Sequence, residues 1–491
     1  MNESDSRSSI QDAVHGTMNF DYLTEDIKDE KLKTCIQSII QAPTFQRLRH
    51  ISQLGMANLI YPTANHDRFS HSLGAAYIAS QVLKRLEIWY GKDREKKDLI
   101  DSDVKKYAFF GTLLHDIGHG PFSHAFEGLL SSGNAKIIKH EHWTEMFLKE
   151  EKEFSNTLEL ELGLDVDVLI DLITGRWRNR KKDKKNRKDY GIAADIISSQ
   201  MDVDRCDYLL RDSYFTGVPY NKIDLGWLIN HLCIFSAKEL KEGAARLGIQ
   251  QKGVTAAAHL LLSRYRLHRV IYLHKKVQLL ETLLIMFFRQ LAQLLKEDKI
   301  CLSEYSVGIF LKKYLVNAYD FSNMSEALQK EARKDFITEN YKYYKNLTDY
   351  DVWMLVRDFA VCSCKSKGPI VDLNAIARAI YNRDLHRAYP IKNKKYSKVS
   401  KKIQKKGYDW RVIPLELKVK AYDISKDPIW VQTVASSGKR KHADLVKKSS
   451  LLSGISKKRK TKTAWLMVYD NKDKSVINKL KKDLGNLAPT F

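Results

Sequence analysis

Apolar residues recur at helical spacing along most of the chain, and this periodicity is the feature that most constrains the fold. It is clear in four segments, residues 46–55, 72–91, 104–118 and 256–295. Only 9 prolines and 23 glycines occur in 491 residues, so residues that interrupt helices are rare. We therefore predict a mainly α fold, with a helical domain over residues 12–389 and a disordered tail over residues 1–11.

The C-terminal part of the chain has a different pattern. Residues 412–424 and 463–470 alternate like strands, and residues 474–485 have the pattern of an amphipathic helix. We predict a small α+β lobe with lysine-rich loops over residues 390–491.

Positive charge is concentrated in two places. Residues 389–463 contain 22 lysines and arginines against 5 acidic residues, and residues 176–190 form a second basic segment that we expect to be an exposed loop. The formal net charge is +24, which favours an anionic partner such as a nucleotide, a nucleic acid or polyphosphate. The alternative is a surface that only keeps the protein soluble.

Segments that would place the chain in a membrane or outside the cell are not evident. No apolar run approaches the roughly 18–20 residues of a membrane span, and the N-terminus lacks a secretory pattern. We predict a cytoplasmic protein with no membrane partner. Its six scattered cysteines are then expected to be reduced thiols. Only Cys362 and Cys364 lie close together in the sequence, and no second pair completes a zinc site.

The segment LLHDIGHGPFSHAFE, residues 113–127, is the most informative for chemistry. His115 and Asp116 are neighbours, and both can reach one ion only at a helix end or where other helices close around it. His71 and Asp204 lie in motif-like surroundings and can complete the set. Two imidazoles and two carboxylates suit Mn, Fe, Ni or Zn better than Mg or Ca.

Further titratable residues lie close to this group in the sequence. His119 and His124 flank GPFS, and Glu127 follows His124 by three residues, so it could orient that imidazole. A histidinium near a leaving oxygen is a suitable general acid. His140 forms another histidine–acid unit with Glu141.

A phosphorylated substrate also needs cationic side chains. The candidates are Arg68, Arg205 and Arg264. Four polar residues from 264 to 275 fall roughly on one helical face, and strongly apolar segments flank them: Arg264, His268, Tyr272 and Lys275. We expect this face to line a cavity, and the alternative is a solvated basic helix face.

Seven motifs together resemble the HD-domain deoxynucleoside triphosphate (dNTP) triphosphohydrolases. They cover roughly residues 12–280 and are DAVHG (12–16), FQRLRHISQLG (45–55), NHDRFSHSLG (65–74), HDIGHGPFSHAFE (115–127), HEHW (140–143), DVDRCDYLLRDSYFTGV (202–218) and the helix from 272 to 275. The resemblance implies that water attacks the α-phosphorus and releases deoxynucleoside and triphosphate. It also implies one metal ion, held by His71, His115, Asp116 and Asp204, with Mg as an optional second ion on the triphosphate.

The resemblance also assigns roles to other residues of this chain. The catalytic positions are His124, His140, Glu127 and His119. The substrate positions are Arg68, Gln53, Arg205, Tyr208, Asp212, Arg264, His268 and Tyr272. Gln46 and Arg49 match regulatory positions, while Gln41 stands where the animal enzymes have an aspartate, and Arg205 stands where some relatives have lysine. Relatives of this kind form nucleotide-regulated homo-oligomers, so a dimer or tetramer is expected, with a role in dNTP balance or phage defence.

Two other functions fit the same residues. The first is a nuclease that cleaves DNA or RNA and binds it through the basic C-terminal lobe. Few aromatic residues accompany the lysines there, mainly Tyr396, Tyr408 and Trp410, which disfavours single-strand stacking. The second is a nucleotide-sensing protein with little turnover, which would require an incomplete site.

Overall fold

The computed structural model describes sixteen segments of the chain. They are residues 9–20, 30–127, 131–132, 135–136, 138–179, 188–219, 223–297, 300, 308, 312–313, 325–362, 369–419, 427–434, 440–452, 461–469 and 474–489. Most of the basic segment 176–190 therefore lies outside the described residues.

The described part of the chain is mainly helical, which confirms the predicted fold class. Its helices are α2 (Glu30–Gln41), α3 (Pro43–Gln46), α4 (Arg68–Tyr90), α5 (Ser102–Leu114), α6 (His124–Glu127), α7 (His140–Glu150), α8 (Lys152–Ser155), α9 (Val166–Ile173), α10 (Gly191–Ile197), α11 (Val203–Thr216), α12 (Leu225–Asn230), α13 (Ala237–Leu240), α14 (Val254–Leu267), α15 (Lys275–Lys296), α17 (Glu326–Tyr344), α18 (Asp349–Val361), α19 (Pro369–Tyr381), α20 (Asn393–Lys405), α21 (Leu445–Lys448) and α23 (Lys474–Leu484).

The strands are short and form small sheets. They are β1 (Ile10–Asp12), β2 (Gly16–Met18), β3 (Ser131–Ser132), β4 (Ala135–Lys136), β5 (Leu232–Phe235), β6 (Arg246–Gln250), β7 (Arg387–Ile391), β8 (Val412–Val419), β9 (Trp430–Val434), β10 (Arg440–Asp444) and β11 (Thr461–Val468).

Three helices that frame the candidate site begin at an aspartate. Asp67 accepts a hydrogen bond from the Ser70 backbone N–H and starts α4, and Asp101 and Asp202 start α5 and α11 in the same way. These caps satisfy backbone donors that a helix start leaves unpaired. They fix where each helix begins, and so which residues stand in its first turn.

The centre of the molecule is a packed group of helices. Helix α4 lies against α5 and α11, and α11 lies against α14. Helix α5 contributes buried phenylalanines such as Phe109 and Phe110 to the core. This core holds the first turns of α4 and α11 and the end of α5 close to one another.

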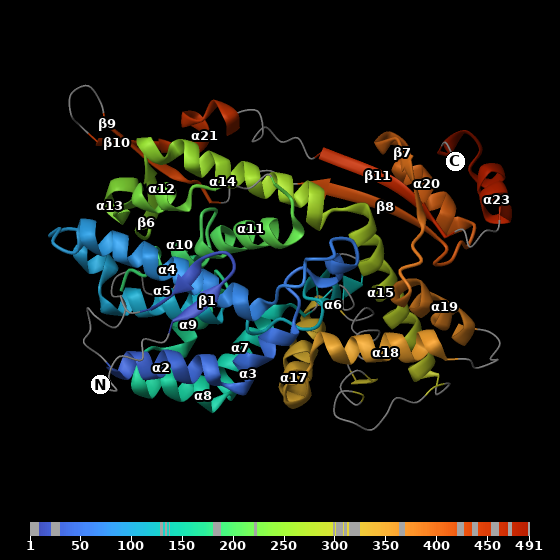
Figure 1. The fold of residues 1–491 in the computed structure, drawn as a ribbon, viewed down its shortest axis with the longest axis horizontal. Helices are drawn as coiled ribbons and strands as arrows, with labels where there is room; N and C mark the ends of the chain where they lie inside the picture. The colour runs from blue at the N-terminus through green and yellow to red at the C-terminus, as the bar shows by residue number, and fades with distance from the viewer. Residues whose placement is uncertain are drawn as a thin grey trace.

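A four-stranded sheet joins distant parts of the chain. Its order is β10-β9-β6-β5, and β9 pairs in parallel with β6 through Ile249↔Val431 and Gln250↔Gln432. Strands β9 and β10 therefore lie beside β6, away from the other C-terminal strands (Figure 1).

The remaining C-terminal strands form a second sheet of order β7-β11-β8. Apolar residues of this sheet pack with α20 and α23 in a cluster of their own: Ile391, Val399, Ile403, Val412, Ala464, Leu466, Val468, Leu480 and Leu484. The strands β8 and β11 and the helix α23 confirm the predicted secondary structure of this region. The division of the chain at residue 390 stays a prediction, and β7 crosses that position.

Two predicted helical segments are interrupted. Residues 46–55 contain a short 3-10 turn, Arg47–His50, and then a bend. The segment 256–295 is broken between α14 and α15 by a π-helical turn, His268–Tyr272, and His274 then caps α15. Apolar periodicity does not reveal such a break, because both helices bury apolar faces in the same core.

Two smaller expectations are also corrected. Ile10 and Gln11, assigned to a disordered tail, lie in β1 and pair with β2, whereas residues 1–8 lie outside the described residues. Cys362 is disulfide-bonded, whereas Cys35, Cys206 and Cys233 are free thiols.

Helix α15 meets the length and composition of a membrane span, contrary to the expectation that no segment would. It is the single such helix in the described part of the chain, and 56% of its most apolar window is buried inside the protein. Burial of this kind is typical of a helix in a protein core.

Candidate active site

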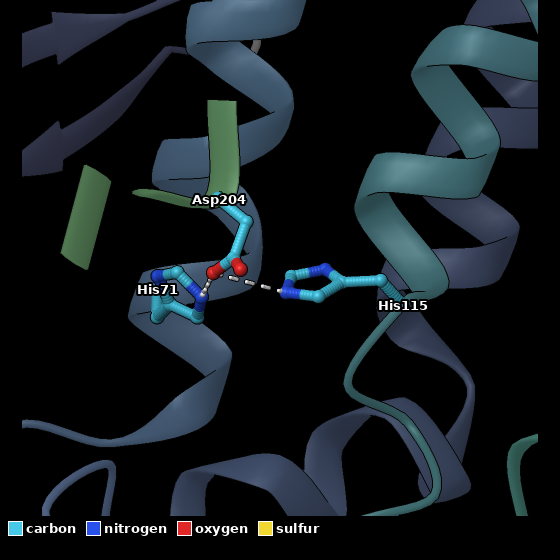
Figure 2. A group of neighbouring side chains, drawn as sticks. All are labelled: His71, His115 and Asp204. Carbon is cyan, nitrogen blue, oxygen red and sulfur yellow. Dashed lines mark hydrogen bonds and ion pairs between the residues drawn. The ribbon is translucent and has the colours of Figure 1, made fainter. Parts of the chain in front are cut away.

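Three predicted metal ligands converge at helix ends. His71 stands in the first turn of α4, Asp204 in the first turn of α11, and His115 directly after the last residue of α5 (Figure 2). His71 Nε2 lies 3.1 Å from Asp204 Oδ1, and His115 Nε2 lies 3.6 Å from the same oxygen. These three side chains are close enough to hold one metal ion.

The state of His115 fits such an ion. Its Nδ1–H donates to the Thr112 carbonyl at 2.6 Å, so Nε2 is the nitrogen that faces the cluster. Burial alone would lower the pKa of His115, but Asp116 and Asp204 raise it, so a metal ion would replace a proton at this nitrogen. Among the described residues, this buried Nε2 has no hydrogen-bond partner. A buried polar atom without a partner is costly, and a bound metal ion would satisfy it.

Asp116 lies at the edge of the same cluster. Its carboxylate is 3.6 Å from His71 Nε2 and 3.4 Å from His115 Nε2, and it also pairs with Arg68. Burial alone would raise the pKa of Asp116, but Arg68 and the nearby imidazoles lower it well below its ordinary value. The carboxylate is therefore ionised, as a metal ligand must be.

His71, in the first turn of α4, carries a proton on Nε2 when no metal ion is bound there. Burial alone would lower the pKa of His71, but its hydrogen bonds with Asp204 and Asp207 raise it to about 10. Burial alone would raise the pKa of Asp204, but the imidazoles of His115 and His71 lower it. An ion bound at Nε2 would replace this proton.

Asp207 is a site residue that the sequence reasoning missed. Its carboxylate is completely buried and accepts the Nδ1–H of His71 at 2.7 Å. Burial alone would raise its pKa, but Arg211 and the hydrogen bonds from His15 and His71 lower it well below the ordinary value. The signal was present, because Asp207 follows Asp204 by three residues on a helix and lies in the motif DVDRCDYLLRD.

A second group lies next to the metal cluster. His140 Nδ1–H donates to Glu127 Oε1 at 2.6 Å, and the rings of His119 and His140 stack at 3.9 Å. His119 Nε2 is 3.3 Å from Asp116 Oδ1, which joins the two groups. Glu127 was expected to orient His124, and the structure shows it on His140. The side chain of His124 lies outside the described part of the chain.

Two of the predicted phosphate-binding arginines come from different helices to one place. Arg205 of α11 contacts Asp202 and the Ser199 carbonyl, and Arg264 of α14 donates to Gln200 at 3.1 Å. Burial and the charges of these two arginines lower the pKa of His268 to about 4. The neutral imidazole and the two cations form a positive region beside the cluster.

The predicted sugar-binding residues also lie together. Asp212 accepts hydrogen bonds from the Tyr272 hydroxyl and, at 2.8 Å, from His66 Nε2–H. The ring of Tyr208 lies between those of Tyr272 and His71, at centroid distances of 6.2 and 6.5 Å. His66 was missed, although it precedes Arg68 by two residues in a quoted motif.

Gln53 stands on the segment before α4. Its backbone N–H donates to the His66 carbonyl, and its side-chain Oε1 is buried without a hydrogen-bond partner among the described residues. That oxygen is available to a ligand.

Lys275 does not share a face with Arg264, His268 and Tyr272, which corrects that prediction. The π-helical turn and the break before α15 change the helical register, so the Lys275 ammonium lies 4.0 Å from the centre of the Trp465 ring. It lines a separate cavity of about 280 Å³ with Arg269, Leu273, His274, Leu417, Thr463 and Trp465.

Gln46 and Arg49 contact each other. Arg49 Nε donates to Gln46 Oε1 at 2.7 Å, and its guanidinium lies 3.6 Å from the centre of the Phe69 ring. Their regulatory role stays a prediction.

Two buried residues to which the sequence assigned no role hold the loop between His115 and His124, although one of them, Arg47, lies in the quoted motif FQRLRHISQLG. Asp349 accepts from the backbone N–H groups of Ser52 and Phe122, and Arg47 donates to the carbonyls of Ile117 and His119. Asp349 lies far along the chain from every motif, so only the folded structure connects it to the site.

Comparison with known families identifies the central helices. Residues 68–212 match the HD domain family, a range that begins with α4 and ends in α11. His71, His115, Asp116 and Asp204 all lie within it. The predicted recognition is confirmed: the chain contains an HD domain.

Curated relatives include proteins with and without a named activity. An uncharacterized protein of Methanocaldococcus jannaschii is 33% identical over 56% of this chain and 48% of its own length. The deoxynucleoside triphosphate triphosphohydrolase SAMHD1 homolog of Dictyostelium discoideum is 26% identical over 72% of this chain and 61% of its own. The chicken enzyme SAMHD1 is 33% identical over 51% of this chain and 42% of its own. The chain spans about half the length of the curated relatives it matches.

Solved structures share the fold over nearly the whole chain. A phosphohydrolase of Bacteroides thetaiotaomicron superposes with a TM-score of 0.67 at 24% identity, covering 94% of this chain and all of its own. A hypothetical protein of Aquifex aeolicus gives 0.61 at 22% identity, covering 97% and 99%. At these identities the likeness establishes the fold.

Proposed function

We propose that this protein is a metal-dependent dNTP triphosphohydrolase that converts a dNTP to deoxynucleoside and triphosphate. The observation that carries the proposal is that the predicted phosphate-binding and sugar-binding residues both lie around Tyr208, whose ring centre is 6.5 Å from that of His71 in the metal cluster. Arg205, Arg264 and Asp212 all lie close enough for their charges to act on the Tyr208 hydroxyl, and the ring of Tyr272, whose hydroxyl donates to Asp212, lies 6.2 Å from that of Tyr208. Relatives named as triphosphohydrolases, at 26–33% identity, support this substrate class.

The proposed site would hold one divalent ion, Mn, Fe, Ni or Zn, through His71, His115, Asp116 and Asp204. When bound, such an ion polarises the phosphate and lowers the pKa of a water molecule. Arg68, Arg205 and Arg264 would offset the negative charge of the phosphates. A water oxygen bonds to the α-phosphorus, the bond to the 5′-oxygen breaks, and triphosphate is released intact.

The proton for the leaving 5′-oxygen would come from a histidine. The His140 imidazole is oriented by Glu127 and stacks on His119, which borders Asp116. His124 is the second candidate on the basis of the sequence motif. Asp212, with Tyr208, would bind the 3′-hydroxyl and leave no room for a 2′-hydroxyl. This exclusion of a 2′-hydroxyl is the basis proposed for selecting deoxynucleotides.

The direct test is to incubate the purified protein with Mn²⁺ and each dNTP, singly and mixed, and to separate the products by ion exchange. Deoxynucleoside and triphosphate in equal amounts are expected, and turnover only in mixtures would indicate nucleotide regulation. Release of diphosphate or monophosphate would contradict the proposed position of attack. A parallel incubation with single- and double-stranded DNA tests nuclease activity.

Asp204→Asn tests the metal cluster within the same assay. Loss of an outer hydrogen-bond partner of a metal ligand costs about 10–100-fold in affinity or activity, so removing a ligand carboxylate should lower turnover by more than about 100-fold. The matched control is Asp167→Asn, an exposed carboxylate on α9, which should leave turnover unchanged. Turnover by Asp204→Asn at the wild-type rate would rule out this cluster as the reaction centre.

A second candidate function, nucleic-acid binding, is favoured by one observation. Helix α20 exposes lysines at i, i+4, i+7 and i+11, namely Lys394, Lys398, Lys401 and Lys405. In the described part of the chain, none of these four forms an ion pair. The opposite face, with Val399 and Ile403, packs on the C-terminal sheet, so the helix has no apolar face free to insert into a membrane.

A further inference from the structure

Both nitrogens of the His71 ring are engaged, and one of them faces away from the metal cluster. Nε2 points to Asp204, while Nδ1–H donates to Asp207 Oδ2. A hydrogen bond at Nδ1 fixes which nitrogen is presented to a metal and how the ring is oriented. The geometry of Asp207 therefore controls that of His71.

Asp207 is itself held by other side chains. Arg211, one helical turn later on α11, donates to both of its oxygens at 2.8 and 2.9 Å, and His15 Nε2–H donates to Oδ1 at 2.6 Å. With the bond from His71, the buried carboxylate accepts four hydrogen bonds. It has no freedom to turn unless one of these partners is removed.

The network continues into the N-terminal hairpin. Asp12 of β1 accepts from Arg211 at 2.8 and 3.3 Å and from the backbone N–H groups of Val14 and His15, both at 2.9 Å. Asp12 thus positions Arg211 and also shapes the turn that presents His15. Asp12, Val14 and His15 precede the HD domain match, which begins at residue 68, whereas Arg211 lies within it.

The packing around this network leaves room for nothing larger. Gly74 lies on α4 three residues after His71, and a Cβ there would overlap Asp207 Oδ1 and Arg211 Nη2. Two buried carboxylates and one guanidinium give the network a net charge of −1 beside His71. A negative charge behind a ligating imidazole strengthens it as a ligand.

We propose that Asp12, His15 and Arg211 are positioning residues that act on the metal ligand His71 through Asp207. The N-terminal hairpin is then part of the metal site, although none of its residues reaches the metal position. The inference rests on the metal cluster assigned under the proposed function and does not depend on which phosphorylated substrate is cleaved.

The test measures metal affinity of the full-length protein without using turnover. Metal-free protein is titrated with Mn²⁺, and free Mn²⁺ is followed by electron paramagnetic resonance. Asp12→Asn should weaken the affinity about 10–100-fold. The Co²⁺-loaded form should show a changed visible spectrum, because the orientation of His71 changes.

Two variants of His15 separate positioning from folding. His15→Ala removes the donor to Asp207 and should weaken Mn²⁺ binding, whereas His15→Gln places an amide N–H near the same point and should restore most of it. Melting temperatures of the metal-free proteins show whether each variant is folded. If Asp12→Asn fails to fold, the difference in Mn²⁺ affinity between His15→Ala and His15→Gln tests the inference.

Glu151→Gln is the matched control for loss of a buried acid. Glu151 is buried and paired with Tyr341 and Lys345, away from the cluster. The Glu151→Gln variant should have a lower melting temperature than the wild type and the same Mn²⁺ affinity. Equal Mn²⁺ affinity in wild type, Asp12→Asn and His15→Ala overturns the inference, as does a wild type that binds no Mn²⁺. Wild type that binds Mn²⁺ but cleaves no dNTP overturns only the proposed substrate.

Discussion

At the scale of single residues, each buried carboxylate of this site lies beside a cationic or imidazole side chain. Burial without such a partner would disfavour its negative charge. Burial alone would raise the pKa values of three carboxylates, but their cationic or imidazole neighbours lower these values: Asp116, Asp204 and Asp207. Removing a single partner would leave a buried charge unpaired, which is strongly destabilising. The side chains around the metal position therefore depend on one another.

Gly74→Ala is expected to disturb this arrangement. The added methyl group would overlap the Asp207 carboxylate and the Arg211 guanidinium, so we expect a loss of about 1–3 kcal/mol in the free energy of unfolding. Urea denaturation of the metal-free protein measures it. Gly226→Ala in α12 is the control, because a Cβ there meets only Asp224 Oδ1 at 3.8 Å. This variant should gain up to about 1 kcal/mol in the free energy of unfolding. Equal stabilities of both variants would contradict the steric argument.

The sequence brought together the proposed metal ligands because their residue types stand in recognisable surroundings at helix ends. His71, His115 and Asp204 lie together as expected. Residues such as Asp349 carry no such signal: it looks like any helix-starting aspartate, yet it accepts hydrogen bonds from the backbone N–H groups of Phe122 and Ser52. Their partners are set by packing of distant segments, which no local pattern encodes.

At the scale of elements, helix periodicity predicted α4, α5 and α23 and failed at the junction of α14 and α15. A π-helical turn adds a residue to one turn of the helix, and the apolar pattern continues through it on both sides. The consequence falls on Lys275, which lies against Trp465 and not beside Tyr272. Short strands such as β5 and β6 were missed because a few buried apolar residues fit either helix or strand.

The lysine-bearing face of α20 leads to a prediction about this helix alone. Replacing Lys394, Lys398, Lys401 and Lys405 by glutamine should weaken binding to double-stranded DNA at low salt by about tenfold or more and flatten its salt dependence, since each lost phosphate contact lowers the slope by about one. Fluorescence anisotropy at several salt concentrations measures both quantities.

The control for α20 makes the same change in net charge at other positions of the protein. Four exposed lysines that are not neighbours, Lys238, Lys252, Lys334 and Lys342, are replaced in the same way. Equal losses in the two quadruple variants would mean that net charge, and not the face of α20, attracts DNA.

At the scale of the whole molecule, a buried histidine lies where α15, α19 and the C-terminal sheet meet. His386 is completely buried, its Nε2–H donates to the Trp410 carbonyl at 2.8 Å, and its own carbonyl accepts from Lys276 of α15. Burial, with the nearby Lys276, lowers the pKa of His386 to about 4. The folded protein therefore keeps this ring neutral.

The stability of the protein should consequently depend on pH. The unfolded chain takes up a proton at His386 near pH 6.5 and the folded chain only near pH 4, so stability is full above pH 6.5 and falls as pH drops toward 4. Between pH 7 and pH 5 the loss from this residue is about 2 kcal/mol. His386→Gln should reduce that loss in urea denaturation, and the exposed His259→Gln should not. An unchanged pH dependence in His386→Gln would contradict this assignment.

The parallel pairing of β9 with β6 has a consequence for how the protein is made. β6 ends at Gln250, and its partner β9 begins only at Trp430, so the ribosome finishes one strand well before it supplies the other. At about 5–20 residues per second, this interval lasts roughly 10–40 s. Throughout it, the edge of β6 exposes unpaired backbone groups that can recruit a strand from another nascent chain. Translation that slows within the intervening stretch would lengthen this exposure, so production of intact protein depends on the speed of elongation.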